Sequence, residues 1–292
     1  MKYLLPAILA FFPSIILCQL PSTQIYYFEL EPHGASELQL TKPRYLTAYN
    51  EGGYNNQPNF FTPYDLYFTQ QGAGDTLQTD IFKLDLVRKV KYRVTATLDQ
   101  EYSPTLMPDK LNFSVVRVEP GGLQRLWSLP RNQQGKGYPI FKDLTTVGYH
   151  CWLEPDLVAL FMVGEPHYLI VAKPSDGSQV KVASNIGRCL KKLPNGNLAY
   201  VQKATESTWY IKEYKLLTGT SEIVMKTLPG SEDFTILDDG TFLMALGGTI
   251  FKKHPAIDDT WSPVANLENF GLKNIQRLSS FGEKYLAVVN VN

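Results

Sequence analysis

The chain has 292 residues, of which 44% are hydrophobic and 12% are aromatic. This length suits one large or two medium globular domains and is too great for a small disulfide-stabilised scaffold. The 17 tyrosines and 15 phenylalanines favour sheet over helix. The 28 basic and 28 acidic residues cancel and no basic run is present, so we predict no binding to nucleic acid.

The N-terminal residues predict an export signal. An apolar run extends from Tyr3 to Cys18 behind a single positive charge. It has the length of a signal-peptide core and falls short of the ~20 residues of a membrane span. Pro6 and Pro13 argue against the alternatives, a buried first strand or a membrane anchor. We therefore expect a periplasmic or extracellular protein with no transmembrane segment in its mature form.

The expected cleavage site lies beside Cys18. Leu17, directly before it, is bulky where lipoprotein signals carry a small residue, which favours ordinary signal peptidase over lipid attachment. The domain organisation predicted is a signal peptide at residues 1–18 and one domain at residues 19–292. We expect this domain to be a monomer.

A unit of apolar strand, tight turn and apolar strand recurs six times along the chain. Every turn carries Pro, Asp, Asn or Gly, which tolerate tight-turn dihedral angles. The first residues of the second strands serve as markers, and they are Leu66, Leu111, Leu157, Leu198, Phe242 and Tyr285. Their successive intervals are 45, 46, 41, 44 and 43 residues. A period of ~40–50 residues is typical of the four-stranded blade of a β-propeller.

The termini predict how the ring closes. Further strand–turn–strand segments follow the earlier units, but the unit at Tyr285 is followed only by the end of the sequence at Asn292. A matching outer pair lies instead at Gln24–Thr41, with no inner pair before it. We therefore predict an all-β, six-bladed propeller of four-stranded antiparallel blades. N-terminal outer strands would pair with C-terminal inner strands, which protects the sheet edges.

The turn motifs resemble those of the TolB-like propellers. In that family Ser-Pro or Pro-Asp-Gly precedes the second strand of a blade, and "YSPTLMPDK" at Tyr102–Lys110 is similar to this pattern. Looser matches are "LPNGN" at Leu193–Asn197 and "LDDGT" at Leu237–Thr241. The resemblance covers nearly the whole of residues 19–292. It implies an extracytoplasmic, usually non-catalytic module that binds proteins or small ligands.

The segments before the inner strands predict a ligand site at one mouth of the central channel. The candidate residues are Asn56, Glu101, His150, Arg188, Glu232, Asp233 and Lys273. In a ligand site, Arg188 and Lys273 would hold an anion while Glu101 and Glu232 set the polarity. The alternative is a solvated polar rim. His150 is expected to form hydrogen bonds in the channel wall, and no catalytic residue is predicted.

The alternative function is a Ca²⁺-assisted hydrolase of small esters or lactones. Asn56, Glu101 and Asp233 would supply the oxygen ligands. Otherwise we predict no cofactor and no metal, because the four histidines fall in different blade elements and do not suggest a metal cluster. The nucleophile elbow G-x-S-x-G is absent from the sequence. Cys151 and Cys189 could pair in an exported protein, but they fall on different repeats, which favours two buried thiols.

Overall fold

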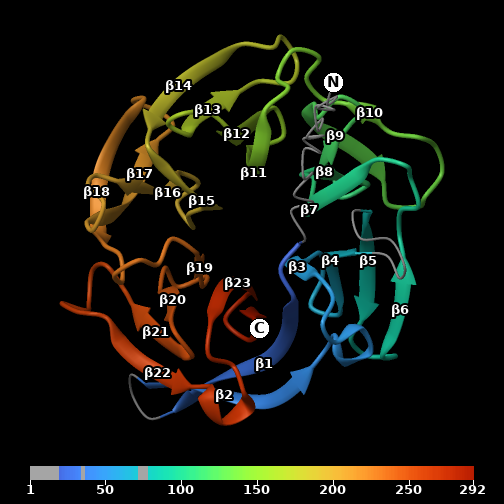
Figure 1. Ribbon diagram of the computed structural model, residues 1–292. Helices are drawn as coiled ribbons and strands as arrows, with labels where there is room; N and C mark the ends of the chain where they lie inside the picture. Colours follow the sequence, from blue (N-terminus) through green and yellow to red (C-terminus); the bar gives the residue numbers. More distant parts are fainter. Residues whose placement is uncertain (1–19, 34–36, 72–77) are drawn as a thin grey trace, which may run out of the picture.

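The computed structural model describes residues 20–33, 37–71 and 78–292. They form six four-stranded antiparallel sheets arranged as the blades of a ring, as Figure 1 shows. This confirms the predicted six-bladed propeller. The predicted signal segment, Tyr3–Cys18, lies outside the described residues. Within the described ranges, no helix has both the length and the apolar character needed to cross a membrane.

Five blades are continuous in sequence, and the strands of each follow one another from the channel outward. Blade 1 comprises β3 (Asn55–Phe60), β4 (Asp65–Gln71), β5 (Thr79–Asp85) and β6 (Val90–Arg93). Blade 2 comprises β7 (Gln100–Leu106), β8 (Asn112–Val118), β9 (Gln124–Pro130) and β10 (Tyr138–Pro139). Blade 3 comprises β11 (Val147–Glu154), β12 (Leu157–Met162), β13 (Tyr168–Ala172) and β14 (Gln179–Ser184).

The remaining blades follow the same order. Blade 4 comprises β15 (Ile186–Lys192), β16 (Leu198–Lys203), β17 (Trp209–Lys215) and β18 (Thr220–Lys226). Blade 5 comprises β19 (Phe234–Ile236), β20 (Phe242–Leu246), β21 (Thr249–Lys253) and β22 (Ser262–Asn266). Blade 6 comprises β23 (Ile275–Phe281), β24 (Tyr285–Val291), β1 (Thr23–His33) and β2 (Glu37–Tyr45). Two short 3-10 helices, η1 (Ala48–Asn50) and η2 (Glu268–Phe270), lie in connections.

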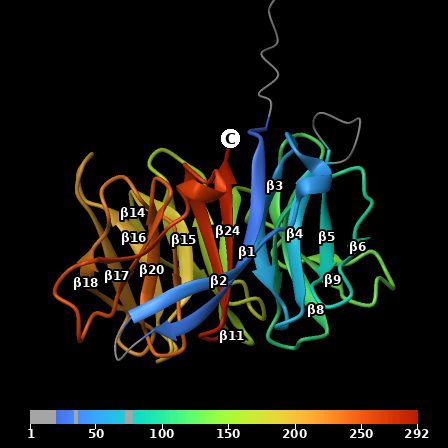
Figure 2. The ribbon, with the colours of Figure 1, turned by 90° about the horizontal axis from the view of Figure 1, so that it is seen from below.

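Blade 6 closes the ring by joining the two ends of the chain. β1 pairs with β24 in an antiparallel register from Thr23 opposite Val291 to Glu29 opposite Tyr285. Figure 2 shows β1 and β24 side by side, with the C-terminus on the same face as the start of β1. The Thr23 hydroxyl also bonds the backbone of Asn55 in blade 1. The closure predicted from the split unit is therefore confirmed.

Packing between neighbouring blades forms the core. One cluster joins Ile25 of blade 6 to Phe68 of blade 1, and another joins Leu153 of blade 3 to Tyr200 of blade 4. All four side chains are at most 1% exposed. Successive residues of a strand point to opposite faces of its sheet, and each face packs against a neighbouring blade. The apolar side chains of every repeat are therefore fully buried only when the ring is complete.

Candidate functional site

The inner strands of the ring share an irregularity that shapes the channel wall. All six lie within the described residues, and the pairing of five of them with their neighbours shifts register near their first residues. Such β-bulges change the direction in which side chains point. In two of them the bulge includes a residue with positive φ, Gln57 at 54° and Ser103 at 56°. The Gln57 side-chain oxygen accepts a bond of 2.9 Å from the Ser103 amide.

Two adjoining cavities lie along these strands. A throat of about 90 Å³ is lined by residues from five inner strands and the loop before the sixth. A wider mouth of about 280 Å³ extends over blades 5 and 6. Arg188, Asp233 and Leu278 line both. The two cavities therefore form one recess, with a narrow part and a broader part.

Arginines dominate the throat. Arg188 Nε donates to Asp233 Oδ2 at 2.9 Å, and Arg277 Nη1 lies 3.7 Å from the other oxygen of that carboxylate. Arg277 Nη2 also donates to the Tyr149 hydroxyl at 2.8 Å, and its guanidinium lies 5.0 Å from the centre of that ring. Burial acts to lower the pKa of Arg277, but Tyr149 and Asp233 more than offset this and raise it. Both arginines therefore stay charged.

The throat holds more positive than negative charge. Arg188, Arg277 and Lys191 line it against one carboxylate, that of Asp233, which leaves a surplus of two positive charges. Lys191 forms no ion pair with any described residue. A cationic recess with walls of low dielectric constant attracts anions. Arg277 was missed from the sequence because the segment assigned to this position of the sixth repeat ended at Gln276, one residue earlier.

A second ion pair lies at the mouth. Glu232 accepts from Lys203 Nζ at 2.8 Å, and its other oxygen is 3.6 Å from Arg188 Nε. Burial acts to raise the pKa of Glu232, but the bond to Lys203 and the charge of Arg188 lower it overall. Gly187 allows this approach, because a Cβ there would lie 3.0 Å from the Glu232 carboxylate. Glu232 therefore lies in the wall of the mouth with the charge of its carboxylate neutralised.

His150 is a buried hydrogen-bonding residue of the throat wall. Its Nε2 lies 2.6 Å from the hydroxyl of Ser114, which also accepts from Trp152 Nε1 at 2.9 Å. Burial lowers the pKa of His150 to about 3, so the ring is neutral. No described residue bonds its Nδ1. Ser114 is completely buried and no carboxylate orients the ring, so the pair lacks the arrangement of a catalytic triad.

Cys189 also lines the throat. It is unpaired, as is Cys151. Burial raises the pKa of the Cys189 thiol to about 12 and that of Cys151 to about 11. Because the thiolate is the nucleophile, neither cysteine is activated for covalent chemistry.

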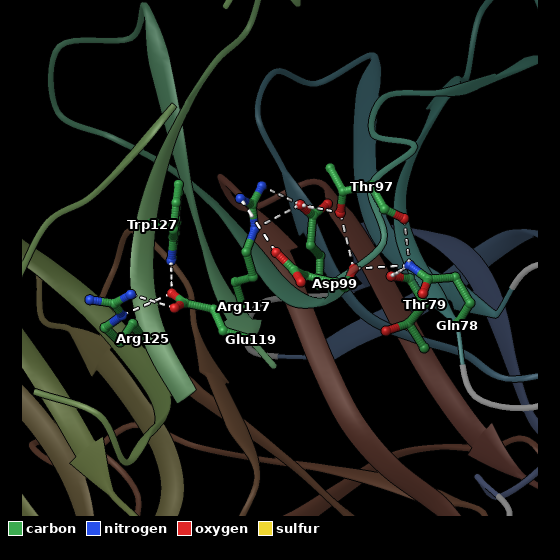
Figure 3. A network of polar contacts seen from close by, with 9 residues as sticks. Gln78, Thr79, Thr97, Asp99, Arg117, Glu119, Arg125 and Trp127 are labelled. Atoms are coloured by element: carbon green, nitrogen blue, oxygen red, sulfur yellow. Dashed lines mark hydrogen bonds and ion pairs between the residues drawn. The ribbon is translucent and has the colours of Figure 1, made fainter. Parts of the chain in front are cut away.

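The structure places Glu101 away from the recess, which corrects its expected position at the mouth. Glu101 is completely buried and accepts from Arg117 Nη2 at 2.6 Å and from the Thr97 hydroxyl. Figure 3 shows Arg117 within a polar network that also includes Asp99 and Trp127. The Arg117 guanidinium lies 4.1 Å from the centre of the Trp127 ring, and Trp127 packs where blades 1 and 2 meet. Glu101 is therefore part of an inter-blade contact.

Two other candidates also fall outside the recess. Asn56 is 8% exposed, and its side-chain oxygen accepts from the adjacent Gln57 amide at 2.7 Å. Lys273 is exposed in the loop before β23. Neither lines the throat or the mouth. The structure thus brings together His150, Arg188, Glu232 and Asp233 from the predicted set, and Arg277 occupies the place that Lys273 was expected to fill.

The structure separates the three ligands proposed for Ca²⁺. Of Asn56, Glu101 and Asp233, only Asp233 lines the recess, and two arginines engage it. Among the residues that the structure describes, no group of three histidine, cysteine or carboxylate side chains is arranged to hold a metal ion. The geometry therefore offers no support for this trio as a metal site.

Comparison with known proteins identifies the fold. No family model and no curated protein matches the sequence. A putative TolB from Agrobacterium tumefaciens superimposes with a TM-score of 0.68 at 11% identity, over 94% of this chain and 99% of that one. TolB from Acinetobacter baumannii gives 0.59 at 11% identity, over 91% of this chain and 63% of that one.

An enzyme shares the same architecture. An oligogalacturonate lyase in complex with manganese superimposes with a TM-score of 0.59 at 13% identity, over 88% of this chain and 83% of that one. TolB proteins and a lyase thus share this ring, and similarity at this level establishes only the fold. The chain has the six-bladed propeller fold of the TolB proteins.

Proposed function

We propose that this protein is an exported, monomeric and non-catalytic binding module that takes a small anionic ligand into its central recess. The observation that carries the proposal is the surplus of two positive charges in the throat, where Arg188, Arg277 and Lys191 face one carboxylate. These three cations are half-buried, and cations removed in part from water with incomplete neutralisation are stabilised when an anion joins them. An anionic group of the ligand would therefore occupy the throat.

The mouth supports a polar body for that ligand. It is three times larger than the throat, at about 280 Å³ against about 90 Å³, and its lining includes Glu232, Asn274 and Gln276. Carboxylate and amide side chains can orient hydroxyl or amine groups. A carboxylate attached to a small polar skeleton, such as a sugar acid or an amino acid, has this combination of features.

Calorimetric titration of the full chain with small carboxylates tests the proposal. Arg277→Met should weaken binding at least about ten-fold, because it removes a charged donor from the throat. Asp233 keeps Arg188 as a partner, so folding should be preserved. Arg125→Met is the matched control: Arg125 pairs with Glu119 in blade 2 and lines neither cavity. Equal affinity in wild type and Arg277→Met would refute the assignment.

The alternatives give different results in the same assay. Binding that requires Ca²⁺ and is lost with chelator would favour the hydrolase. If no small carboxylate binds and a protein partner is captured with unchanged affinity by Arg277→Met, binding occurs on a rim of the propeller and the recess is only a solvated channel.

A further inference from the structure

A second cationic recess lies on the outer side of the ring, between blades 6 and 1. It is a groove of about 410 Å³, bounded by the end of β2, the η1 segment and the turn from β5 to β6. No residue lines both this groove and the throat. Leu46, Leu84 and Leu86 form its apolar part. The groove is therefore a separate feature from the recess described above.

Three cations line the groove without a carboxylate partner. Arg44 donates to the Leu86 carbonyl at 3.1 Å and lies 5.4 Å from the centre of the Tyr27 ring. Lys91 Nζ lies 3.9 Å from the centre of the Tyr49 ring. Lys89 is exposed in the β5–β6 turn. None of these three cations forms an ion pair with another described residue.

The one carboxylate that lines the groove is already engaged. Asp85 Oδ1 accepts from the backbone amides of Val87 at 3.0 Å and Arg88 at 2.8 Å, which holds its own turn together. Its other oxygen lies 3.8 Å from the Arg88 guanidinium. The bond from the Arg88 amide is the main reason that the pKa of Asp85 is lowered. Asp85 therefore stays ionised but is not free to neutralise Arg44, Lys89 or Lys91.

The groove also offers neutral donors. Tyr45 and Tyr49 line it, and burial raises the pKa of both hydroxyls, that of Tyr45 to about 12. The hydroxyls therefore remain protonated at physiological pH and can donate hydrogen bonds. Partial burial lowers the pKa of Lys91, because its ammonium group lies over the rings of Tyr49 and Phe82. An anion that enters the groove would replace the missing solvation.

We propose that this groove binds a compact oxyanion carrying at least two negative charges, a phosphate ester or a polycarboxylate. The lining carries three cations and one carboxylate, a net charge of +2 that a dianion balances. Arg44 supplies a planar donor pair, and the two lysines supply point charges. The apolar part lined by Leu46 would accommodate the carbon skeleton of an organic anion.

Titration of the full chain with inorganic pyrophosphate or citrate, at matched ionic strength, tests this site. The titrations are made in an Arg277→Met background, so that binding in the central recess is weakened. Lys91→Met should weaken binding at least ten-fold while keeping the aliphatic contact with Tyr49. Lys181→Met is the matched control. Lys181 lies on β14, the outer strand of blade 3, and its Nζ is 4.9 Å from the centre of the Tyr168 ring. It lines no part of the groove. Tighter binding of pyrophosphate would assign a phosphate ligand, and tighter binding of citrate a polycarboxylate.

Lysine acylation followed by mass spectrometry provides an independent measurement. Either anion should protect Lys89 and Lys91 from acylation and leave Lys181 unprotected. Absence of binding by both anions would overturn the proposal. So would equal losses in Lys91→Met and Lys181→Met, which would indicate non-specific attraction to surface charge.

Discussion

Replacing His150 with glutamine should remove the part of the acid-induced loss of stability that this one histidine is expected to cause. Burial lowers the pKa of His150 to about 3 in the folded protein, against an ordinary value of 6.5. The unfolded chain therefore binds more protons than the folded chain between these two values, and stability falls as the pH decreases below about 6.5. Each pH unit in this window costs about 1.4 kcal/mol. From about pH 7.5 to about pH 4.5 the loss due to this one residue is about 2.5 kcal/mol.

Glutamine is a suitable replacement because its amide can reach the Ser114 hydroxyl, which lies 2.6 Å from His150 Nε2. The free energy of unfolding in urea is measured by tryptophan fluorescence across this pH range for wild type and His150→Gln. Towards the acidic end, the free energy of unfolding of wild type should fall by about 2.5 kcal/mol more than that of His150→Gln, since all other titrating groups are common to both. His254→Gln, which leaves His150 in place, is the control. Parallel curves for wild type and His150→Gln would refute the assignment of a neutral buried histidine.

Three further outcomes are expected. Deleting Thr23–Tyr45 should abolish cooperative thermal unfolding, because it removes the outer strands of blade 6; an unchanged melting curve for this variant would contradict the closure. Arg117→Met should destabilise the protein by about 3 kcal/mol, because it leaves Glu101 buried without its cation. The control is Lys215→Met, which removes an exposed ion pair and should lower the free energy of unfolding in urea by less than about 1 kcal/mol. Equal losses of stability in Arg117→Met and Lys215→Met would argue against a stabilising buried pair. Intact-mass analysis of the protein from its native host should give a chain that begins near Gln19, whereas a chain starting at Met1 or an acylated Cys18 would disprove the export prediction.

The charged recess and the outer groove differ in the ligand charge that they favour. Both linings hold three cations and one carboxylate, but the carboxylate is engaged differently. In the recess, Asp233 pairs with Arg188 and Arg277 and neutralises part of their charge. In the groove, Asp85 is held by its own turn and leaves the three cations without a carboxylate partner. Polyanions should therefore favour the groove over the recess.

The architecture could be predicted from the sequence because it follows from local patterns repeated along the chain. A turn that tolerates few residue types fixes where each strand pair reverses, and alternation fixes which face is buried. Five of the six markers lie within β4, β12, β16, β20 and β24, and Leu111 precedes β8 by one residue. The closure of blade 6 followed from the same reasoning. The outer pair at the N-terminus and the inner pair at the C-terminus each lack a partner, and pairing them with each other satisfies the backbone hydrogen bonds of both edges.

The site depended on tertiary structure, because the direction of a side chain at a bulge is not encoded in strand alternation. Glu101 and Arg188 both lie near the start of an inner strand, yet Glu101 is buried beside Arg117 and Arg188 lines the recess. Arg277 lies within β23 and reaches the throat because the β23–β24 register shifts between Ile275 and Arg277. The sequence by itself determined the number of blades and how the ring closes. Only the folded ring decided which charges meet in the recess, because that site combines residues from blades that are distant in sequence.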